Sequence, residues 1–212
     1  GYNALYSNTT GNYNTASGRN SMYNATTGND NNTAIGANSM RGTGPYTNSY
    51  YNIALGYYSL YSIDGGDYNL ALGYRALYNN TTGSHNIASG YQALYNNTTG
   101  SWNTALGRSA LYSNITGSNN VALGQMSGYS SLGSNNVFIG NQAGYHETGS
   151  NKLYIDNTNT TAPLIKGDFS TDHITINGDL TITGSLTANF PAVPFATVSN
   201  VTSNSGGNYA TD

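Results

Sequence analysis

Few side chains in this 212-residue sequence have the chemistry for catalysis or metal binding, because only 7% of its residues are charged. Within the repetitive part of the chain, the closest carboxylates are Asp64 and Asp67, in the stretch IDGGD. Paired carboxylates about 5 to 9 Å apart can hydrolyse a glycosidic bond, and oxygen ligands on a glycine-rich loop can bind calcium. The motif occurs once and lacks tandem spacing, so we expect a corner turn with two solvated acids. Asp64 and Asp67 are therefore only a weak metal-site candidate.

The three histidines, His85, His146 and His173, fall in different segments and form no cluster. His85 occupies a position that aromatic residues fill in neighbouring repeats, so we expect it to make a surface contact rather than to act in catalysis or bind a metal. The sequence has no cysteine, which excludes disulfides and thiolate chemistry. We therefore expect no catalytic residues, no enzyme activity and no cofactor.

The charge balance favours no highly charged partner. The formal net charge is −3, with only six Lys and Arg residues, so the sequence has no basic stripe for nucleic acid. No run approaches the roughly 20 apolar residues of a membrane helix. We expect neither nucleic-acid binding nor membrane insertion by this segment.

A repeat of 17 residues dominates the sequence, and three consecutive copies read GYRALYNNTTGSHNIAS, GYQALYNNTTGSWNTAL and GRSALYSNITGSNNVAL. We number the positions of a 17-residue coil from 1, the glycine that precedes the YxAL-like segment, and give the equivalent residues of shorter or longer coils the same number. Nine coils then begin at Gly1, Gly18, Gly36, Gly56, Gly73, Gly90, Gly107, Gly124 and Gly140. Length differences fall in the polar middle of the coil, so we expect loops that vary around segments of constant length.

Each coil contains two short apolar segments, and the second alternates with a period of two, as in Ile87, Ala88 and Ser89. Alternate side chains of a strand point to opposite faces. Two strands per coil, joined by glycine at one corner and by NNTTG at the other, predict an all-β parallel solenoid or roll of about nine coils. Each coil would stack about 4.8 Å above the last, and stacked asparagines would form amide ladders.

A column of alanines runs through the second segment. About three medium apolar side chains per coil make a thin core, which leaves a single chain poorly stabilised. We therefore expect the residues that flank alanine to face the coil interior, and the alanines to permit close approach of a second chain. A homotrimer is the simplest closed arrangement for a fibre. The predicted trimer interface comprises Ala16, Ala34, Ala54, Ala71, Ala88, Ala105 and Ala122.

Two rows of aromatic residues are expected to point outward, one after the apolar pair of the first segment and one at the opposite corner. Such rings could bind sugars or protein partners, or they could only stabilise the stack. The first row contains Tyr6, Tyr23, Tyr61, Tyr78, Tyr95 and Tyr112, and the second contains Tyr13, Tyr51, Tyr68, His85 and Trp102.

The sequence segments NTALGRSAL, NVALGQMS and NTAIGANSM resemble the head repeats of trimeric autotransporter adhesins. The resemblance covers roughly residues 1–156 and implies a left-handed parallel β-roll in each of three chains. The repeat here is longer than the usual one, with the excess in the YNNTT corner, and its tyrosine column is unusual. Similar repeats also occur in bacteriophage tail fibres.

We expect three parts in the chain: β-roll repeats over residues 1–156, a β-strand neck or connector over 157–190, and an extended polar linker over 191–212. The alternation from Ile174 to Ala188 predicts strand, broken near the NGD turn. That neck could be a hairpin packed on the end of the roll or an element intertwined between chains. We also expect the chain to be a piece of a longer protein.

These features predict a non-catalytic, extracellular segment of a cell-surface fibre or adhesin. Its partners would be the other chains of the homotrimer and a host-surface glycan or protein, or the extracellular matrix. One alternative is a receptor-binding module of a bacteriophage tail fibre, located on the virion. Another is an ice-binding repeat protein that uses rows of threonine such as Thr9, Thr81 and Thr98.

Overall fold

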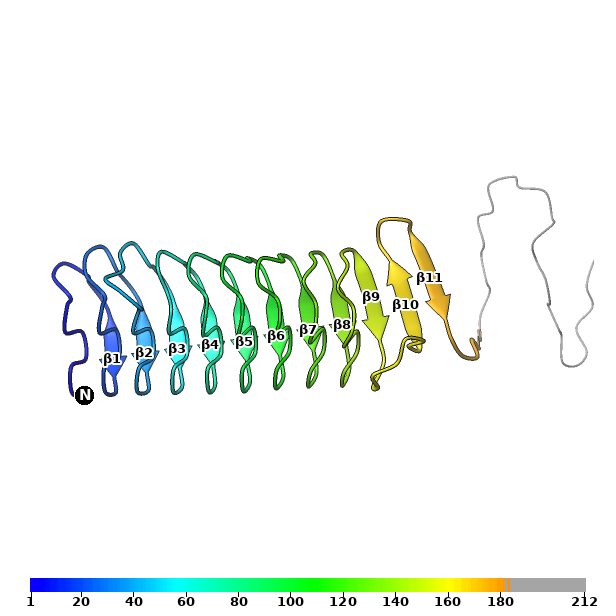
Figure 1. The fold of residues 1–212 in the computed structure, drawn as a ribbon, viewed down its shortest axis with the longest axis horizontal. Helices are drawn as coiled ribbons and strands as arrows, with labels where there is room; N and C mark the ends of the chain where they lie inside the picture. Colours follow the sequence, from blue (N-terminus) through cyan, green and yellow to red (C-terminus); the bar gives the residue numbers. More distant parts are fainter. Residues whose placement is uncertain (182, 184–212) are drawn as a thin grey trace, which may run out of the picture. The chain divides into compact units, whose positions relative to one another are not determined.

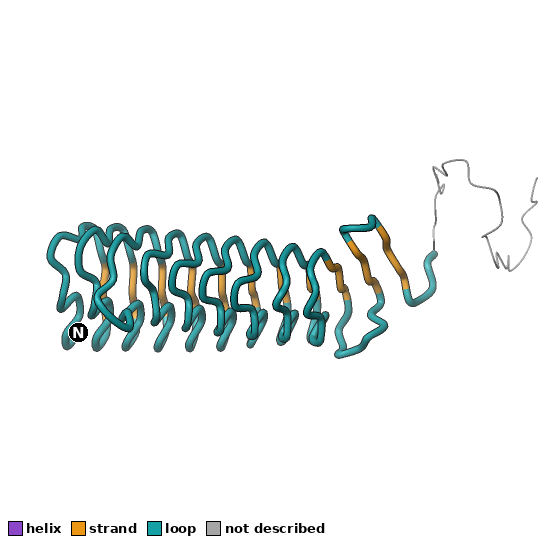
Figure 2. The backbone as a smooth tube through the Cα atoms, turned by 45° about the horizontal axis from the view of Figure 1, so that its top comes forward, coloured by secondary structure: helices purple, strands orange, loops and turns teal. Residues whose placement is uncertain are grey.

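The structure, a computed structural model, describes residues 1–181 and 183, of which residues 1–179 form one compact unit. This unit is a parallel β-solenoid of about eight regular turns, with a repeat of about 17 residues. The described residues contain no helix, and teal loops connect the short orange strands in Figure 2. The predicted fold class is confirmed.

Each regular coil contributes one strand of three residues to a single sheet (Figure 1). Neighbouring strands pair in parallel and in register, so that Ala88 lies opposite Ala105. A longer strand, β9 (Lys152–Ile155), continues the parallel stack after β8. The regular strands are β1 (Thr15–Ser17), β2 (Thr33–Ile35), β3 (Ile53–Leu55), β4 (Leu70–Leu72), β5 (Ile87–Ser89), β6 (Thr104–Leu106), β7 (Val121–Leu123) and β8 (Val137–Ile139).

The predicted second strand of each coil is wrong, because the YxALY segment is a series of turns. Positions 3 and 5 have positive φ, for example 55° at Arg75 and 51° at Leu77, whereas strands require strongly negative φ. The segment still stacks in register: the Leu77 N–H donates to the Ala93 carbonyl at 3.0 Å and the Arg75 N–H to the Tyr57 carbonyl at 3.0 Å. Backbone groups are therefore satisfied between coils without a second strand.

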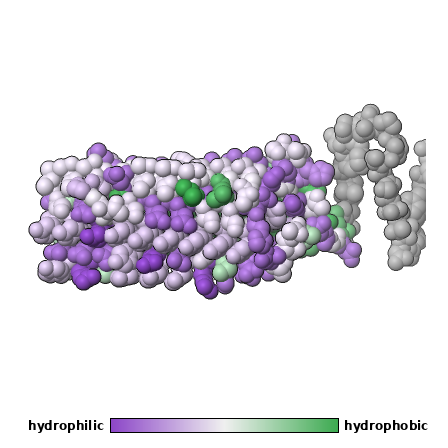
Figure 3. All heavy atoms as spheres, in the orientation of Figure 1, coloured by the Kyte–Doolittle hydropathy of each residue, from purple (hydrophilic) through white to green (hydrophobic). Residues whose placement is uncertain are grey.

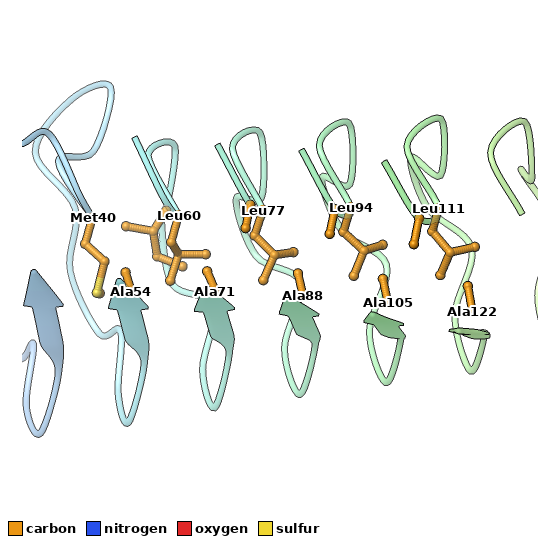
Figure 4. Packing of buried hydrophobic residues seen from close by; sticks show 14 of the residues in the cluster. Met40, Ala54, Leu60, Ala71, Leu77, Ala88, Leu94, Ala105, Leu111 and Ala122 are labelled. Atoms are coloured by element: carbon orange, nitrogen blue, oxygen red, sulfur yellow. The ribbon is translucent and has the colours of Figure 1, made fainter. Parts of the chain in front are cut away.

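The core lies between the strand and the turn segment of each coil. Alanines at position 16 and leucines at position 5 approach each other there, as Leu77 and Ala88 do in Figure 4. Both columns are fully buried over the central coils. The buried members are Ala34, Ala54, Ala71, Ala88, Ala105 and Ala122 from the strands, and Leu60, Leu77, Leu94 and Leu111 from the turns.

The assignment of the alanine column to a trimer interface is wrong. The alanines from Ala34 to Ala122 are enclosed by their own chain, and Ala16 near the N-terminal end is partly buried. The residues that flank alanine were expected inside but point outward: Ile53 is 42% exposed and Leu106 is 41% exposed. Since leucine fills most of the narrow space between strand and turn, only alanine fits beside it.

Glycine at position 1 allows the coils to stack closely at the end of each strand. Gly73 has a φ of 123°, a region that side chains rarely adopt. A Cβ atom on Gly73 would also lie 2.8 Å from the carbonyl oxygen of Gly90 in the next coil. The regular recurrence of this glycine is thus required by the stacking distance.

Near the C-terminal end of the solenoid, the strand side of the core carries a large residue and the turn side carries small ones, the reverse of the other coils. Phe138 replaces alanine in β8 and is fully buried, while Gly128 and Gly144 replace the leucines of the two adjoining turns. A Cβ on Gly128 would lie 2.4 Å from the Phe138 ring, and one on Gly144 would lie 2.2 Å from it. One large ring from the strand side therefore fills the space that two leucines fill elsewhere.

The sheet continues past the expected boundary at residue 157. β10 (Ile165–Asp168) pairs antiparallel with β9, and β11 (His173–Ile176) pairs antiparallel with β10. The observed hairpin therefore precedes the NGD turn, and Ile174 in β11 is 64% exposed. The remaining part of the predicted neck from residue 184 onward and the predicted linker 191–212 lie outside the described residues.

Replacement of Phe138 tests the exchange of core residues. We expect Phe138→Ala to lower the free energy of unfolding by about 3 to 5 kcal/mol, because it opens a cavity that nearby glycines cannot fill. Adding Gly128→Leu and Gly144→Leu should recover at least half of this loss by rebuilding the regular core. Urea unfolding measures both changes, and Phe169→Ala, at an exposed phenylalanine, is the control. A triple variant no more stable than the single one would contradict the exchange.

Candidate functional site

The candidate functional side chains of this protein form rows that run from coil to coil. A buried asparagine ladder at position 14 holds the coils in register and thereby aligns the other rows. The Asn86 backbone N–H and Nδ2 both donate to the Asn69 Oδ1, at 3.0 and 3.2 Å. The Asn86 Nδ2 also donates to the Gly100 carbonyl at 2.8 Å. Each amide therefore bonds to the preceding coil through its neighbour's Oδ1 and to the following coil through a glycine carbonyl, which fixes the register of the stack. The buried ladder contains Asn32, Asn52, Asn69, Asn86, Asn103, Asn120 and Asn136.

A second asparagine ladder occupies position 8, at the NNTTG corner. The Asn97 Nδ2 donates to the Asn80 Oδ1 at 2.7 Å, and the Asn114 Nδ2 donates to the Asn97 Oδ1 at 3.0 Å. All three side chains are fully buried. Their NTT and NIT triplets match the pattern for sugar attachment to asparagine, but in the folded solenoid these amides are not accessible.

The acids of the IDGGD stretch have different environments. The Asp67 carboxylate accepts the Tyr50 N–H at 2.7 Å, as serine hydroxyls at the same position do in later coils. Asp30 likewise accepts the Asn12 N–H at 2.6 Å. Asp64 is exposed. Among the residues that the structure describes, no three His, Cys, Asp or Glu side chains lie close enough together to hold a metal ion.

The first tyrosine row forms a stack along the solenoid that is interrupted at Arg41. Tyr78 and Tyr95 have ring centroids 5.2 Å apart and planes within 7° of parallel. The predicted members all belong to this row, which continues through Tyr129 and Tyr145. Since each ring face contacts the next ring, the row presents its ring edges and hydroxyl groups to the outside.

Arg41 replaces tyrosine in this row and bridges the resulting gap. Its guanidinium carbon lies 5.4 Å from the centroid of Tyr23 and 5.7 Å from that of Tyr61. One guanidinium N–H also donates to the Tyr61 hydroxyl at 2.6 Å. A cation over two aromatic rings thus substitutes for ring stacking.

The second aromatic row, at position 13, is also stacked in the structure. Tyr51, Tyr68, His85 and Trp102 follow one another, with His85 and Trp102 centroids 3.9 Å apart. The predicted surface position of His85 among aromatic residues is confirmed. Tyr13 is 87% exposed and makes no ring contact, because Asn31 occupies the same position in the next coil.

A third aromatic row was missed from the sequence. Tyr57, Tyr74 and Tyr91 stack at position 2, with centroids 5.8 and 5.0 Å apart. Arg19 and Arg108 occupy the same position in other coils, and the Arg108 guanidinium lies 5.9 Å from the Tyr91 centroid. The signal in the sequence is the recurrence of tyrosine at position 2, directly after the first glycine of the coil. Arginine at the same position in other coils makes this recurrence hard to recognise.

The charges near the C-terminal end of the solenoid are concentrated around β9 and β10. The Lys152 Nζ lies 2.6 Å from the Asp168 Oδ2. Hydrogen bonds from Lys152 and Ser170 hold the pKa of Asp168 well below its usual range. The Tyr154 hydroxyl donates to the Glu147 Oε2 at 2.7 Å. Burial, and to a smaller extent this hydrogen bond, raises the pKa of Tyr154. A cavity of about 350 Å³ lies beside these groups and is open to solvent.

The threonines considered for ice binding use their hydroxyl groups within the stack. The Thr81 hydroxyl donates to the Thr98 carbonyl at 3.1 Å, and the Thr98 hydroxyl donates to the Ile115 carbonyl at 3.1 Å. Thr9 makes the corresponding bond to Thr26 at 3.4 Å. These hydroxyl hydrogens therefore stabilise the coil corners.

Comparison with known proteins finds no relative for this chain. No family model matches it, and neither a curated protein nor a solved structure matches it significantly. None of the described residues forms a helix long and apolar enough to cross a membrane. The arrangement of the side-chain rows is therefore what supports a function.

Substitution in the middle of the first asparagine ladder should destabilise the protein strongly. Asn103→Ala removes the acceptor of the Asn120 N–H and Nδ2 and the donor to the Gly117 carbonyl. We expect a loss of about 3 kcal/mol in the free energy of unfolding, because buried polar groups remain unpaired. Chemical unfolding tests this, with Asn141→Ala at an exposed asparagine as control. Equal stabilities of the two variants would contradict the ladder's role.

The Lys152–Asp168 pair should make stability depend on pH. The pKa of Asp168 is lowered in the folded protein, so ionised Asp168 stabilises the fold above the pKa of an unfolded aspartate. That contribution is lost as the pH falls through the folded-state pKa. We expect Asp168→Asn to lower the thermal unfolding midpoint at neutral pH and to match the wild type in strong acid. Asp64→Asn, at an exposed acid, is the control. A deficit that persists in strong acid would contradict this role.

Proposed function

We propose that this chain is a non-catalytic segment of an extracellular, cell-surface fibre or adhesin, and that it assembles as a homotrimer. The single observation that carries the proposal is an uncharged apolar face along the outside of the sheet. The resemblance of the coils to trimeric adhesin heads supports the same assembly.

The aliphatic face, as we name it, consists of the two outward positions of each strand from β1 to β8. It contains no charged residue in either row. Six of its large side chains have exposed fractions between 36% and 45%: Ile35, Ile53, Leu55, Ile87, Leu106 and Ile139. The other members are Thr15, Thr33, Leu70, Thr104, Val121 and Val137 at position 15, and Ser17, Leu72, Ser89 and Leu123 at position 17.

The dimensions of the aliphatic face fit an interface. It is roughly 34 Å long and about 7 Å wide before the side chains are counted, from the rung spacing and the residue rise of a strand. A contiguous apolar strip that runs the length of a sheet is the kind of surface that often marks an interaction site. By contrast, the face of the solenoid seen in Figure 3 is largely hydrophilic.

Other copies of the same chain are the partners that best match this face. The aliphatic face is straight and repeats at the rung spacing, and another solenoid presents apolar side chains at the same spacing. Three copies around an axis parallel to the solenoid would bury all three faces and close the assembly. In this arrangement the strand residues that flank alanine, rather than the alanines, form the interface.

A non-catalytic role agrees with how the chain uses its acids. Asp30 and Asp67 accept backbone N–H groups of neighbouring coils, and Asp168 pairs with Lys152. Each of these carboxylates thus has a stabilising partner. The remaining outward rows, built from tyrosine and arginine, then supply the contacts of the fibre with its surroundings.

A charged substitution on the aliphatic face should dissociate the trimer without unfolding the chain. We expect wild type to have the mass of three chains in size-exclusion chromatography with light scattering. Leu55→Asp combined with Leu106→Asp should reduce the mass threefold, because the aspartates would be buried unpaired. The control combines Ile115→Asp with Leu132→Asp, at exposed residues away from this face, and should keep the mass of three chains.

Two results would contradict the proposed assembly. One is a wild-type chain that stays monomeric at high concentration. The other is equal dissociation of the aliphatic-face variant and the control, which would show that the face is not the interface.

A further inference from the structure

We infer that the turn side of the solenoid binds an acidic polysaccharide that lies along the coil axis. The surface, which we name the arginine–tyrosine face, is formed by coil positions 2, 3 and 6. This inference rests on the proposed function, because a surface fibre would present the face to an external polymer. Its members are Arg19, Arg41, Arg75 and Arg108 with Tyr23, Tyr57, Tyr58, Tyr61, Tyr74, Tyr78, Tyr91 and Tyr95.

Ring contacts show that the three positions share one surface. Tyr58, at position 3, contacts Tyr57 at position 2 and Tyr61 at position 6, with centroids 4.3 and 5.0 Å apart. In the next coil, the Arg75 guanidinium lies 5.7 Å from the centroid of Tyr58, 5.1 Å from Tyr74 and 5.4 Å from Tyr78. Arg75 therefore sits at the centre of the face, held between two tyrosine rows.

All four arginines of the sequence lie on this face, although the chain has a net charge of −3. None of them is within ion-pair distance of a carboxylate of the described residues, where the one ion pair joins Lys152 and Asp168. The Arg75 Nε is buried and lacks a hydrogen-bond partner. The face thus carries positive charge that no acid of the described chain neutralises.

The spacing of the arginines favours a polymer with sparse charge. Arg41, Arg75 and Arg108 belong to the third, fifth and seventh coils, so these three guanidinium groups are two rungs apart, about 9.6 Å along the axis. Arg19, in the second coil, lies one rung before Arg41 and adds a fourth charge at that end of the face. An extended polysaccharide with one carboxylate in every disaccharide carries its charges at a spacing of this order. Tyrosine hydroxyls on the intervening rungs can exchange hydrogen bonds with sugar hydroxyls.

A nucleic acid fits the arginine–tyrosine face less well. A nucleic-acid strand carries a phosphate about every 3.4 Å, which is nearly three charges for each guanidinium group. Single-stranded nucleic acids also bind by stacking bases on aromatic faces. Here the ring faces are already in contact with one another, as between Tyr78 and Tyr95. Only edges, hydroxyls and guanidinium groups remain available, and these suit a hydroxylated anionic polymer.

The test uses the full chain and hyaluronan oligosaccharides, which have one carboxylate per disaccharide, as the probe. Uncharged dextran and a single-stranded DNA oligomer are the comparison probes. We expect hyaluronan to bind and added salt to weaken its binding. Replacing Arg41, Arg75 and Arg108 together by Gln should weaken that binding at least tenfold, because charge-assisted hydrogen bonds are lost. Lys152→Gln with Lys166→Gln, which removes two positive charges elsewhere, should change the affinity less than twofold.

A second variant keeps the test valid if the triple variant fails to fold. Arg19→Gln with Arg108→Gln alters two exposed arginines and should weaken hyaluronan binding at least threefold, in proportion to the charge removed, with an unchanged unfolding midpoint.

The inference is overturned if wild type does not bind hyaluronan, if the arginine variants bind like wild type, or if DNA binds more tightly than hyaluronan. Light scattering on the same samples separates this inference from the proposed function. A trimer that does not bind contradicts only the polysaccharide site, and a monomer that binds contradicts only the trimer.

Discussion

The structure depends on the requirement that each coil superimpose on the next, so that the buried amides of position 14 find their partners. An Asn86 side chain without Asn69 on one side and Asn103 on the other would leave buried polar groups unpaired, which costs more than most single contacts contribute. This requirement explains why the strand and turn segments keep their length from coil to coil and why glycine recurs at position 1. It also explains why identical or similar residues stack in each column.

Exact stacking leaves little room for a core and thereby determines which residues face outward. A coil of about 17 residues with one short strand encloses a column of alanine against a column of leucine, and the other aliphatic residues of the strand face outward. The outside of the sheet is consequently apolar, and the turn side carries tyrosine and arginine. We propose that the apolar side joins the chains of a trimer and that the turn side contacts an acidic polymer.

The sequence predicts the solenoid because residues at equivalent positions of successive repeats stack on one another in the structure, so each stack is visible as a recurring residue type in the sequence. It does not decide which face of each strand is inside, because a period of two is the same for both choices. Ala88 was therefore placed outside and Ile87 inside, whereas the opposite holds, since Leu77 fills the narrow interior. The turn conformation of the YxAL segment was also missed, because leucine and arginine rarely adopt the positive φ found at Leu77 and Arg75. The Tyr57 row was hidden by arginines in the same column.

Disulfide formation between cysteines placed one coil apart tests the stacking register most directly, because the native chain has no cysteine. Thr82 and Thr99 are both exposed and lie 17 residues apart, so their Cα atoms should be about 4.8 Å apart, within the range of a disulfide. The account predicts that Thr82→Cys with Thr99→Cys forms an intrachain disulfide in air, measured by mass spectrometry. Thr82→Cys with Thr116→Cys, two coils apart, should not. Cross-linking of both pairs with equal efficiency, or of the distant pair alone, would contradict the register.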